Sequence, residues 1–489
     1  MKTQEIENYI EKLYYNQNAG AMPEQQNLFA KKDYYDLLKT VIETVNENKD
    51  CSISELYQKL YEKSEVAKSV TDFIYKKEMA PGMVFSFGTM NHQETIILGN
   101  QQEVKLNSDG KIVPEIKEMT ENTIFDLASI TKLFTSLSIL KLVEKGIINL
   151  DDKITKYDDR FINLKNVSIF DLLSFGVPLK TTSRIDKALS KEEAEEVLFN
   201  IEIDYNNNNY HPYTDMGAMV LKYIIEKASS TNYYTFVEEN ILKKLNMTDT
   251  HVNIPKYKLD RVASTNLDYK FYKDGNVGIS KFDNGVAYDP KAQIMGQANG
   301  NLSGHAGIFS TVPDIKKLAK GIINSDILNK KYIEMMAKNR TGKKYIENGE
   351  ENYAQYLGFL CYSKNPIAYS TEVYHALSGK SIASAGWTGP QLTIDPVNEI
   401  FLFMAANRSH NRASFIDKAW QDKVITEPSG RRFINFNGKE IVDSTKFAWD
   451  RNDYVLYPTL KLALQYKMLE DIMNYHKTEE IENDEVKHL

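Results

Sequence analysis

Apolar residues recur every three or four positions in several stretches of the chain, which predicts amphipathic helices. A stretch near the N-terminus has apolar residues at 34, 37, 38, 41, 42 and 45. A stronger pattern begins at Ser129, with apolar residues at 130, 133, 134, 137, 140 and 143. Gly146 follows this run, and glycine commonly ends a helix. We therefore predict a helix in the N-terminal segment and a buried helix that opens at Ser129.

Strand patterns lie at both ends of the chain. Val84–Gly88 and Thr95–Leu98 predict a hairpin, and further strand-like runs cover residues 382–387, 391–396 and 400–406. The stretch from about 150 to 345 mixes short helices with polar loops. Pairing of the two ends predicts an α+β fold with a central antiparallel sheet flanked by helices, plus an all-α lobe. A cleft between two such lobes is a natural place for a catalytic pocket.

These patterns predict three parts of the chain. Residues 1–65 form a helical N-terminal extension, residues 66–420 form a catalytic body, and residues 421–489 form a C-terminal segment. Within the last part, residues 456–475 predict a terminal helix that packs on the sheet. Residues 421–450 show no clear pattern of either kind.

Composition and residue spacing disfavour several classes of function. The net charge of −7 disfavours nucleic acid as a partner, and no apolar run approaches the length needed to span a bilayer. The N-terminal residues are polar and lack the apolar core of a secretory signal, so we expect a cytoplasmic location. Cys51 and Cys361 are far apart, and neither cysteine nor histidine spacing matches a metal site. We expect no metal and no cofactor.

Ser129-Ile130-Thr131-Lys132 is the motif that carries chemistry. Positions i and i+3 share one face of a helix, so Lys132 can accept the proton of the Ser129 hydroxyl and make it a nucleophile. The same four-letter pattern also begins at Ser108 and Ser138. Ser108 lies in an Asp-Gly turn and Ser138 lies in the middle of a helix, so Ser129 is the preferred candidate. The alternative is a surface serine near a helix start.

Acyl transfer also needs a proton relay and donors for an oxyanion. Tyr213 and Asp215 lie where a loop meets a predicted helix, and the Tyr213 phenol next to Lys132 would relay a proton. Alternatively, Thr214 or Asp215 caps that helix and Tyr213 is a core aromatic residue. Near the C-terminal strands, Ser384-Ala385-Gly386-Trp387 offers small residues that permit close approach, and the N–H groups of Ser129 and Trp387 would form an oxyanion hole.

The chain resembles the superfamily of serine β-lactamases and penicillin-binding proteins, in the branch of class C β-lactamases, DD-peptidases and related esterases. That superfamily combines S-x-x-K, Y-x-N and a K/H-x-G strand, in the order seen here at Ser129, Tyr213 and Ser384. The resemblance covers roughly residues 66–420. Further family-like blocks are Leu150–Ile154, Asn166–Leu173, Leu245–Thr250, Gly304–Thr311 and Asn407-Arg408.

The resemblance implies a mechanism. Ser129 attacks a carbonyl and becomes acylated, while Lys132, with Tyr213, accepts the serine proton and passes it to the leaving group. Whether Lys132 or Tyr213 is the base stays open. Water then releases the acid. The implied substrate-binding residues are Asp215, Ser384, Ala385, Gly386, His305 and Arg408, although His305 on its Gly-rich turn is more simply a structural histidine.

This chain departs from the family in three places that matter, and in one of them Ser174-Phe175-Gly176 stands where many relatives carry a His-containing segment. Asp215 replaces the usual Asn and adds negative charge near Lys132, which favours the charged lysine and weakens it as a base. Ser384 and Ala385 replace the Lys or His and the Thr or Ser that orient a substrate carboxylate in relatives. Loss of such a donor costs of order 1–3 kcal/mol in binding a carboxylate. Lys380 or Arg408 is a candidate to supply the missing positive charge for a substrate carboxylate.

The sequence therefore predicts a serine hydrolase that works through an acyl-enzyme on Ser129 and cleaves a small ester or amide, including peptides that end in a D-amino acid. A β-lactam adduct is an expected ligand. The alternatives are a penicillin-binding or sensor-like protein with little turnover, or an acyltransferase in which an amine or hydroxyl replaces water.

Overall fold

The computed structural model describes Asn8 and residues 24–206, 213–341, 344–347, 350–353, 356–364 and 372–487. The predicted N-terminal extension is therefore described from residue 24 onward, apart from Asn8. Among the described residues, none of the helices combines the length and the apolar composition needed to cross a bilayer.

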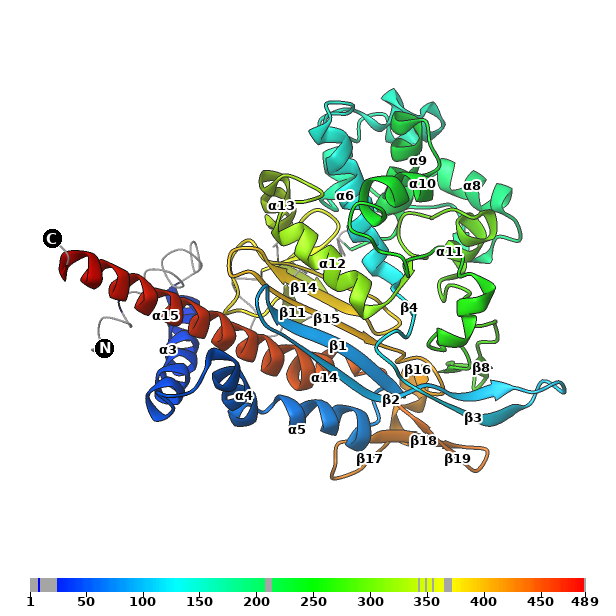
Figure 1. Cartoon of the computed structure of the whole chain (residues 1–489). Helices are drawn as coiled ribbons and strands as arrows, with labels where there is room; N and C mark the ends of the chain where they lie inside the picture. The colour runs from blue at the N-terminus through cyan, green and yellow to red at the C-terminus, as the bar shows by residue number, and fades with distance from the viewer. Residues whose placement is uncertain are drawn as a thin grey trace.

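A seven-stranded antiparallel sheet forms the centre of the molecule (Figure 1). Its strand order is β12-β13-β14-β15-β1-β2-β3, and the bounds are β12 Tyr362–Ser363, β13 Ile382–Ala385, β14 Gln391–Asp395, β15 Ile400–Ala406, β1 Gly82–Thr89, β2 Gln93–Leu106 and β3 Ile112–Glu118. Strand β1 pairs with β15, so the N-terminal hairpin joins the C-terminal strands in one sheet. The predicted pairing of the two ends of the chain is confirmed.

Both faces of the central strands are buried, because alternate residues enter two different cores. Val84, Phe401 and Phe403 belong to the core on one side, whereas Phe85 and Leu402 belong to the core on the other side. Helix α12 (Val312–Ile323) packs on the first face, next to α13 (Lys330–Ala337). The long α15 (Tyr457–Lys487) crosses the second face, as Figure 1 shows.

The N-terminal helices α3 (Glu24–Glu47), α4 (Ile53–Lys63) and α5 (Val66–Thr71) lie against α15 (Figure 1). Their buried residues share one core with α15 and the adjacent face of the sheet. Packing is therefore continuous across residue 65, while the predicted domain boundaries stay a prediction. The predicted terminal helix is present and lies on the sheet.

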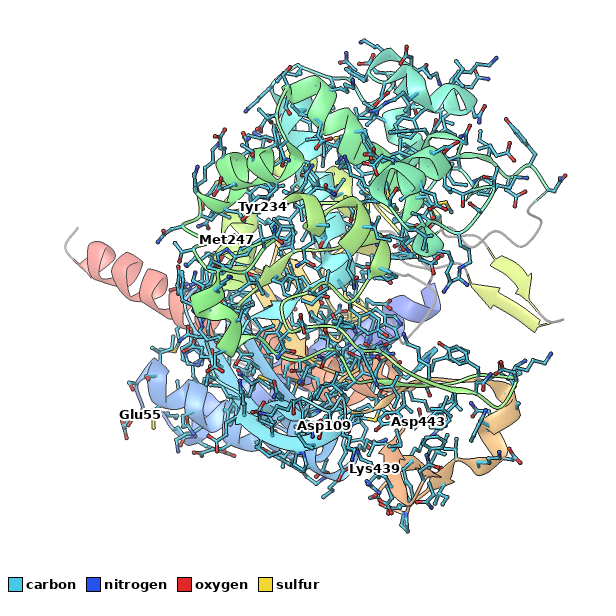
Figure 2. The ribbon with its side chains drawn as sticks, turned by 90° about the vertical axis from the view of Figure 1, so that its right-hand side faces the viewer. Glu55, Asp109, Tyr234, Met247, Lys439 and Asp443 are labelled. Carbon is cyan, nitrogen blue, oxygen red and sulfur yellow. The ribbon has the colours of Figure 1, made fainter. Side chains whose placement is uncertain are left out.

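A helical lobe stands beyond the first face of the sheet. It contains the 3-10 turn η3 (Ala128–Ile130), α6 (Thr131–Glu144), α7 (Ile169–Leu173), α8 (Lys191–Phe199), α9 (Met216–Ser229), α10 (Tyr233–Val237) and α11 (Pro290–Met295). Figure 2 marks this lobe by Tyr234 and Met247, well separated from Glu55 on α4. Helix α6 is buried along most of its length and packs against α9. The predicted α+β class with an all-α lobe is confirmed.

Residues 421–450, which show no pattern in the sequence, contain a small sheet of β17 (Ile425–Thr426), β18 (Arg432–Phe436) and β19 (Lys439–Val442), followed by α14 (Phe447–Arg451). A second small sheet orders β16 (Ala413–Ile416), β7 (Tyr269–Phe271) and β8 (Val277–Ile279). The other short elements are β4 Phe125–Asp126, β5 Leu179–Lys180, β6 Glu202–Ile203, β9 Phe309–Ser310, β10 Lys344–Glu347, β11 Glu350–Tyr353, η2 Asp72–Lys76, η4 Ile154–Lys156, η5 Asp159–Leu164, η6 Ile185–Lys187, η7 Glu238–Leu242, η8 Lys256–Arg261, η9 Gln297–Asn299, η10 Lys418–Lys423 and η11 Asn452–Leu456.

Candidate active site

Ser129 and Lys132 meet as the i, i+3 spacing predicts. Ser129 lies in the 3-10 turn η3, and Lys132 lies in the first turn of α6. The Lys132 ammonium donates a hydrogen bond to Ser129 Oγ over 2.9 Å. Ser129 is half-buried and Lys132 is only 1% exposed. The amine is therefore shielded from water, whereas the hydroxyl lies nearer the surface.

The other two S-x-x-K serines have no such setting. Ser108 lies in the turn between β2 and β3, where Asn107 N–H and the Lys111 carbonyl close the loop. Ser138 is buried in the interior of α6. Local context separates the three matches in the way the sequence predicts.

The turn that carries Ser129 is held in an unusual backbone conformation. Ala128 has φ +45°, a region that residues with a side chain rarely adopt. Its N–H donates to the buried Asp126 carboxylate over 2.8 Å, and Leu127 N–H donates to the Ile308 carbonyl. Backbone strain of this kind persists only where surrounding contacts fix it, and it concentrates at functional sites.

Asp215 and Tyr213, which precede α9, approach the same lysine. Asp215 Oδ1 lies 2.7 Å from Lys132 Nζ, and that nitrogen lies 4.9 Å from the centre of the Tyr213 ring. The Tyr213 ring stacks on Phe175 and on Tyr362, which fix its plane. The second predicted segment therefore reaches the lysine.

Asp215 does not cap α9 with its side chain, although it occupies the N-cap position. Instead, the Thr214 hydroxyl accepts a hydrogen bond from Met216 N–H over 3.2 Å. The capping alternative for Asp215 is therefore wrong, because both of its carboxylate oxygens bond to lysines instead.

The end of β13 passes directly beside the Ser129 turn. A Cβ built on Gly386 would lie 2.5 Å from the Leu127 carbonyl oxygen, so only glycine fits this approach. The Thr388 hydroxyl donates to the Asp126 carbonyl over 2.7 Å. Ser384 is buried, Ala385 is half-buried, and Trp387 is 41% exposed. The three distant segments of the sequence thus meet at one place.

Sequence reasoning missed Lys291 and Asp289. Lys291 Nζ donates to Asp215 Oδ2 over 2.8 Å and lies 3.4 Å from Asp289 Oδ2. Asp289 Oδ1 in turn lies 3.0 Å from His305 Nε2. Asp289 followed by Pro290 signals a helix start, and Asp289 does cap α11. No local signal indicates that this helix reaches Asp215, because the contact between Lys291 and Asp215 spans 76 positions of sequence.

His305 is buried, with 1% of its surface exposed. Its ring bonds Asp289 and the Ser303 hydroxyl, and its backbone carbonyl lies 3.4 Å from Lys132 Nζ as an acceptor. This position favours the structural reading of His305, as a residue that supports Lys132 and Asp289 from behind, over direct contact with a substrate.

The electrostatics of the site are dominated by Asp215. Burial lowers the pKa of Lys132, but the Asp215 carboxylate and the Tyr213 phenol raise it more, so the net pKa lies above its usual value. Burial raises the pKa of Asp215, but Lys132, His305 and Lys291 together hold it well below its usual range. The pair is therefore an ammonium and a carboxylate at neutral pH, as the sequence predicts for Asp in place of Asn.

Arg408 lies behind Trp387. Its guanidinium carbon is 4.3 Å from the centre of the Trp387 ring, whose other neighbour is the stacked Tyr288 ring at 4.5 Å. Arg408 is 8% exposed, and its Nε finds no hydrogen-bond partner among the described residues. Burial lowers the pKa of Arg408 to about 10. Lys380 instead pairs with Glu334 and is exposed.

Within the described part of the chain, Asp215, Asp289 and His305 form the one group whose metal-ligand atoms lie within 4.8 Å of one another. Both oxygens of Asp215 are bonded to lysine ammonium groups, and Asp289 is bonded to Lys291 and His305. These donor atoms are engaged in ion pairs within the protein.

Comparisons with known proteins agree with the fold. The Beta-lactamase family model matches residues 96–427. A protein of Escherichia coli K12 named "Putative D-alanyl-D-alanine carboxypeptidase" is 29% identical over 334 residues, which are 62% of this chain and 73% of that protein.

Two solved structures share the fold. One is the octameric penicillin-binding protein homologue from Pyrococcus abyssi, with a TM-score of 0.51, 20% identity, and coverage of 70% of this chain and 73% of that chain. The other is a class C β-lactamase, with a TM-score of 0.50, 13% identity, and coverage of 83% and 98%.

An S-x-x-K serine beside an antiparallel sheet, faced by a helical lobe, defines a serine hydrolase of the β-lactamase and DD-peptidase type. The chain belongs to the Beta-lactamase family.

Proposed function

We propose that this protein hydrolyses a small ester or amide through an acyl-enzyme on Ser129. The observation that carries the proposal is the 2.9 Å hydrogen bond between Lys132 Nζ and Ser129 Oγ, in a site that Tyr213 and Asp215 also enter. A serine hydroxyl becomes a useful nucleophile when a neighbouring base can accept its proton.

The proposed reaction has two halves. Ser129 Oγ bonds to the substrate carbonyl carbon while its proton passes to the neutral Lys132 amine or to a Tyr213 phenolate. The same proton is then delivered to the alcohol or amine as the bond between that group and the carbonyl carbon breaks. Water next attacks the acyl-enzyme, gives one proton to the site, and frees the acid and the Ser129 hydroxyl. The N–H groups of Ser129 and Trp387 stabilise the negative oxygen in both halves.

The proton inventory of the resting site constrains the first step. Lys132 holds its proton against Asp215, so the neutral amine is the minor form and must be generated before or during attack. Neither Lys132 nor Tyr213 is thereby excluded as the acceptor. The same feature supports a second candidate function, a penicillin-binding or sensor-like protein that acylates but turns over slowly.

The substrate class follows from the β13 side of the site. By resemblance, Ser384 and Ala385 stand at the positions where relatives use a cation and a hydroxyl for a substrate carboxylate. We therefore propose esters and amides without a carboxylate next to the scissile bond as the better substrates, and D-alanyl-D-alanine peptides as the poorer ones. Arg408 is the proposed cation for any anionic group that approaches Trp387.

Intact-mass measurement tests the nucleophile. A fluorophosphonate probe and a penicillin are expected to add one adduct to the wild-type protein and none to Ser129→Ala. Ser108→Ala is the matched control and should label normally, because it lies in an exposed hairpin turn. Equal labelling of Ser129→Ala would refute the assignment.

Turnover separates the two candidate functions. Steady hydrolysis of p-nitrophenyl acetate that disappears in Lys132→Ala supports the hydrolase. A penicillin adduct that persists for hours, with no multiple turnover of the ester, supports the slow-turnover protein. Release of D-alanine from an N-acyl-D-alanyl-D-alanine peptide faster than ester cleavage would contradict the proposed substrate class.

A further inference from the structure

Five residues close a ring of hydrogen bonds and ion pairs behind the nucleophile. Lys132 bonds Asp215, Asp215 bonds Lys291, Lys291 contacts Asp289, and Asp289 bonds the His305 ring. The ring closes because Lys132 Nζ also lies 3.4 Å from the His305 carbonyl oxygen as its donor. From Lys132 to His305 the basic and acidic side chains alternate, and the last contact, between His305 and Lys132, uses the His305 backbone carbonyl.

Lys291 holds a particular place in the ring. Lys132 and Lys291 bond the two different oxygens of one carboxylate, over 2.7 and 2.8 Å. A carboxylate shared between two ammonium groups attracts each of them less completely than it would attract one alone. The second ammonium also places a like charge close to Lys132, and a like charge disfavours the protonated amine.

We propose that Lys291 is a positioning residue that shares the charge of Asp215 and so favours the neutral Lys132 amine, the form that can accept the Ser129 proton. Asp215 stands where the family usually carries an uncharged Asn, and Lys291 offsets the added negative charge from the opposite side. The inference deepens the proposed function and rests on it, since it assumes attack by Ser129.

Among the described residues, titratable side chains that contact Lys132 or the ring behind it come from several segments. Asp215 and Tyr213 approach from the segment before α9, Lys291 and Asp289 approach from α11, and His305 approaches from the loop before β9. Strand β13 contributes no charged side chain on this side. Burial raises the electrostatic influence of each group, because Lys132 is shielded from water.

Three substitutions at Lys291 separate charge from shape. Lys291→Gln keeps a hydrogen-bond donor but removes the charge, and Lys291→Arg keeps the charge. Lys291→Met is a second neutral variant for use if the glutamine variant does not fold. Lys258→Gln is the matched control, because Lys258 is also a partly buried lysine that lies 2.7 Å from a carboxylate, that of Asp249, outside the ring.

The measurement is the second-order rate constant for fluorophosphonate labelling of Ser129 between about pH 6 and 10. In Lys291→Gln, the rising limb of the profile should move to higher pH by about one unit, so labelling at a fixed pH on that limb is about tenfold slower. Lys291→Arg and Lys258→Gln should keep the wild-type profile.

Each outcome decides one point. An unchanged profile in a folded neutral variant overturns the role of Lys291, and so does an equal shift in Lys291→Arg, because that variant retains the charge. Equal labelling of the Ser129→Ala variant and the wild type overturns the proposed function itself. If labelling depends on Ser129 but the pH profile is the same in the wild type and in Lys291→Gln, only the role of Lys291 is overturned.

Discussion

Replacing Asp215 by Asn removes the negative charge that holds the proton on Lys132. The two groups are 2.7 Å apart, and the lysine is buried. Coulomb's law gives about 1.5 kcal/mol for this separation under full water screening and about 6 kcal/mol at an effective dielectric constant of about 20. The lower figure corresponds to about one pKa unit, and opposite charges at such distances commonly shift a pKa by about 1–3 units.

The sign of the effect is fixed by the chemistry. Asp215 raises the pKa of Lys132, so Asp215→Asn lowers it and increases the fraction of neutral amine at a given pH. The rising limb of the kcat/KM profile for p-nitrophenyl acetate should move to lower pH by about 1–3 units. On that limb, the variant should therefore be at least about tenfold faster than the wild type.

Asp249→Asn provides the control. Asp249 also bonds two cations, Lys258 and Arg261, but it lies outside the ring. This variant should keep the wild-type profile, even if it unfolds at a lower temperature. A profile for Asp215→Asn that stays in place or moves to higher pH would refute the reasoning. Damage to the site alone would slow the reaction but would not shift the rising limb to lower pH.

Two further predictions concern the turn that carries the nucleophile. Gly386→Ala should reduce kcat/KM by roughly 10- to 100-fold and the free energy of unfolding by about 1–3 kcal/mol, since the new methyl would press on the Leu127 carbonyl. Gly379→Ala is the control and should change neither quantity, because a Cβ at Gly379 meets nothing within 4 Å. Equal losses in both variants would contradict this prediction. Burial raises the pKa of Asp126 to about 6, so its contribution to stability is present below about pH 4 and is lost as the pH rises through about 6. Between these pH values, the free energy of unfolding of Asp126→Asn should therefore rise by about 3 kcal/mol relative to that of the wild type, as measured by thermal or urea unfolding. A difference between the two proteins that does not change with pH would count against this prediction.

Local sequence was sufficient for the parts of the site that depend on local geometry. The i, i+3 spacing of Ser129 and Lys132 places both on one helical face wherever that helix lies, and Gly146 marks its end. The hairpin, the C-terminal strands and the helix after Asp215 follow from periodicity in the same way. The family blocks then predicted the order in which three distant segments supply the site.

Local sequence did not predict the role of a residue where that role depends on contacts with distant parts of the chain. Asp215 has the signature of a helix cap, yet its oxygens bond two lysines from other elements. Lys291 and Asp289 have only the signature of a helix start. Residues 421–450 alternate too irregularly to predict. Their short strands pair with each other and bury Ile434 and Ile441 in a cluster with Tyr269, Phe271 and Ile416, which come from other parts of the chain.

The amino-acid sequence by itself determined the main helices and strands outside residues 421–450, the α+β class and the pairing of Ser129 with Lys132, because periodicity and short-range spacing act within one element. Only the tertiary structure decided that a second lysine shares the carboxylate of Asp215 and that Gly386, directly after β13, touches the turn before Ser129. Those contacts join residues far apart in the chain, and their energies depend on distances and burial that exist only once the sheet and the helical lobe have come together.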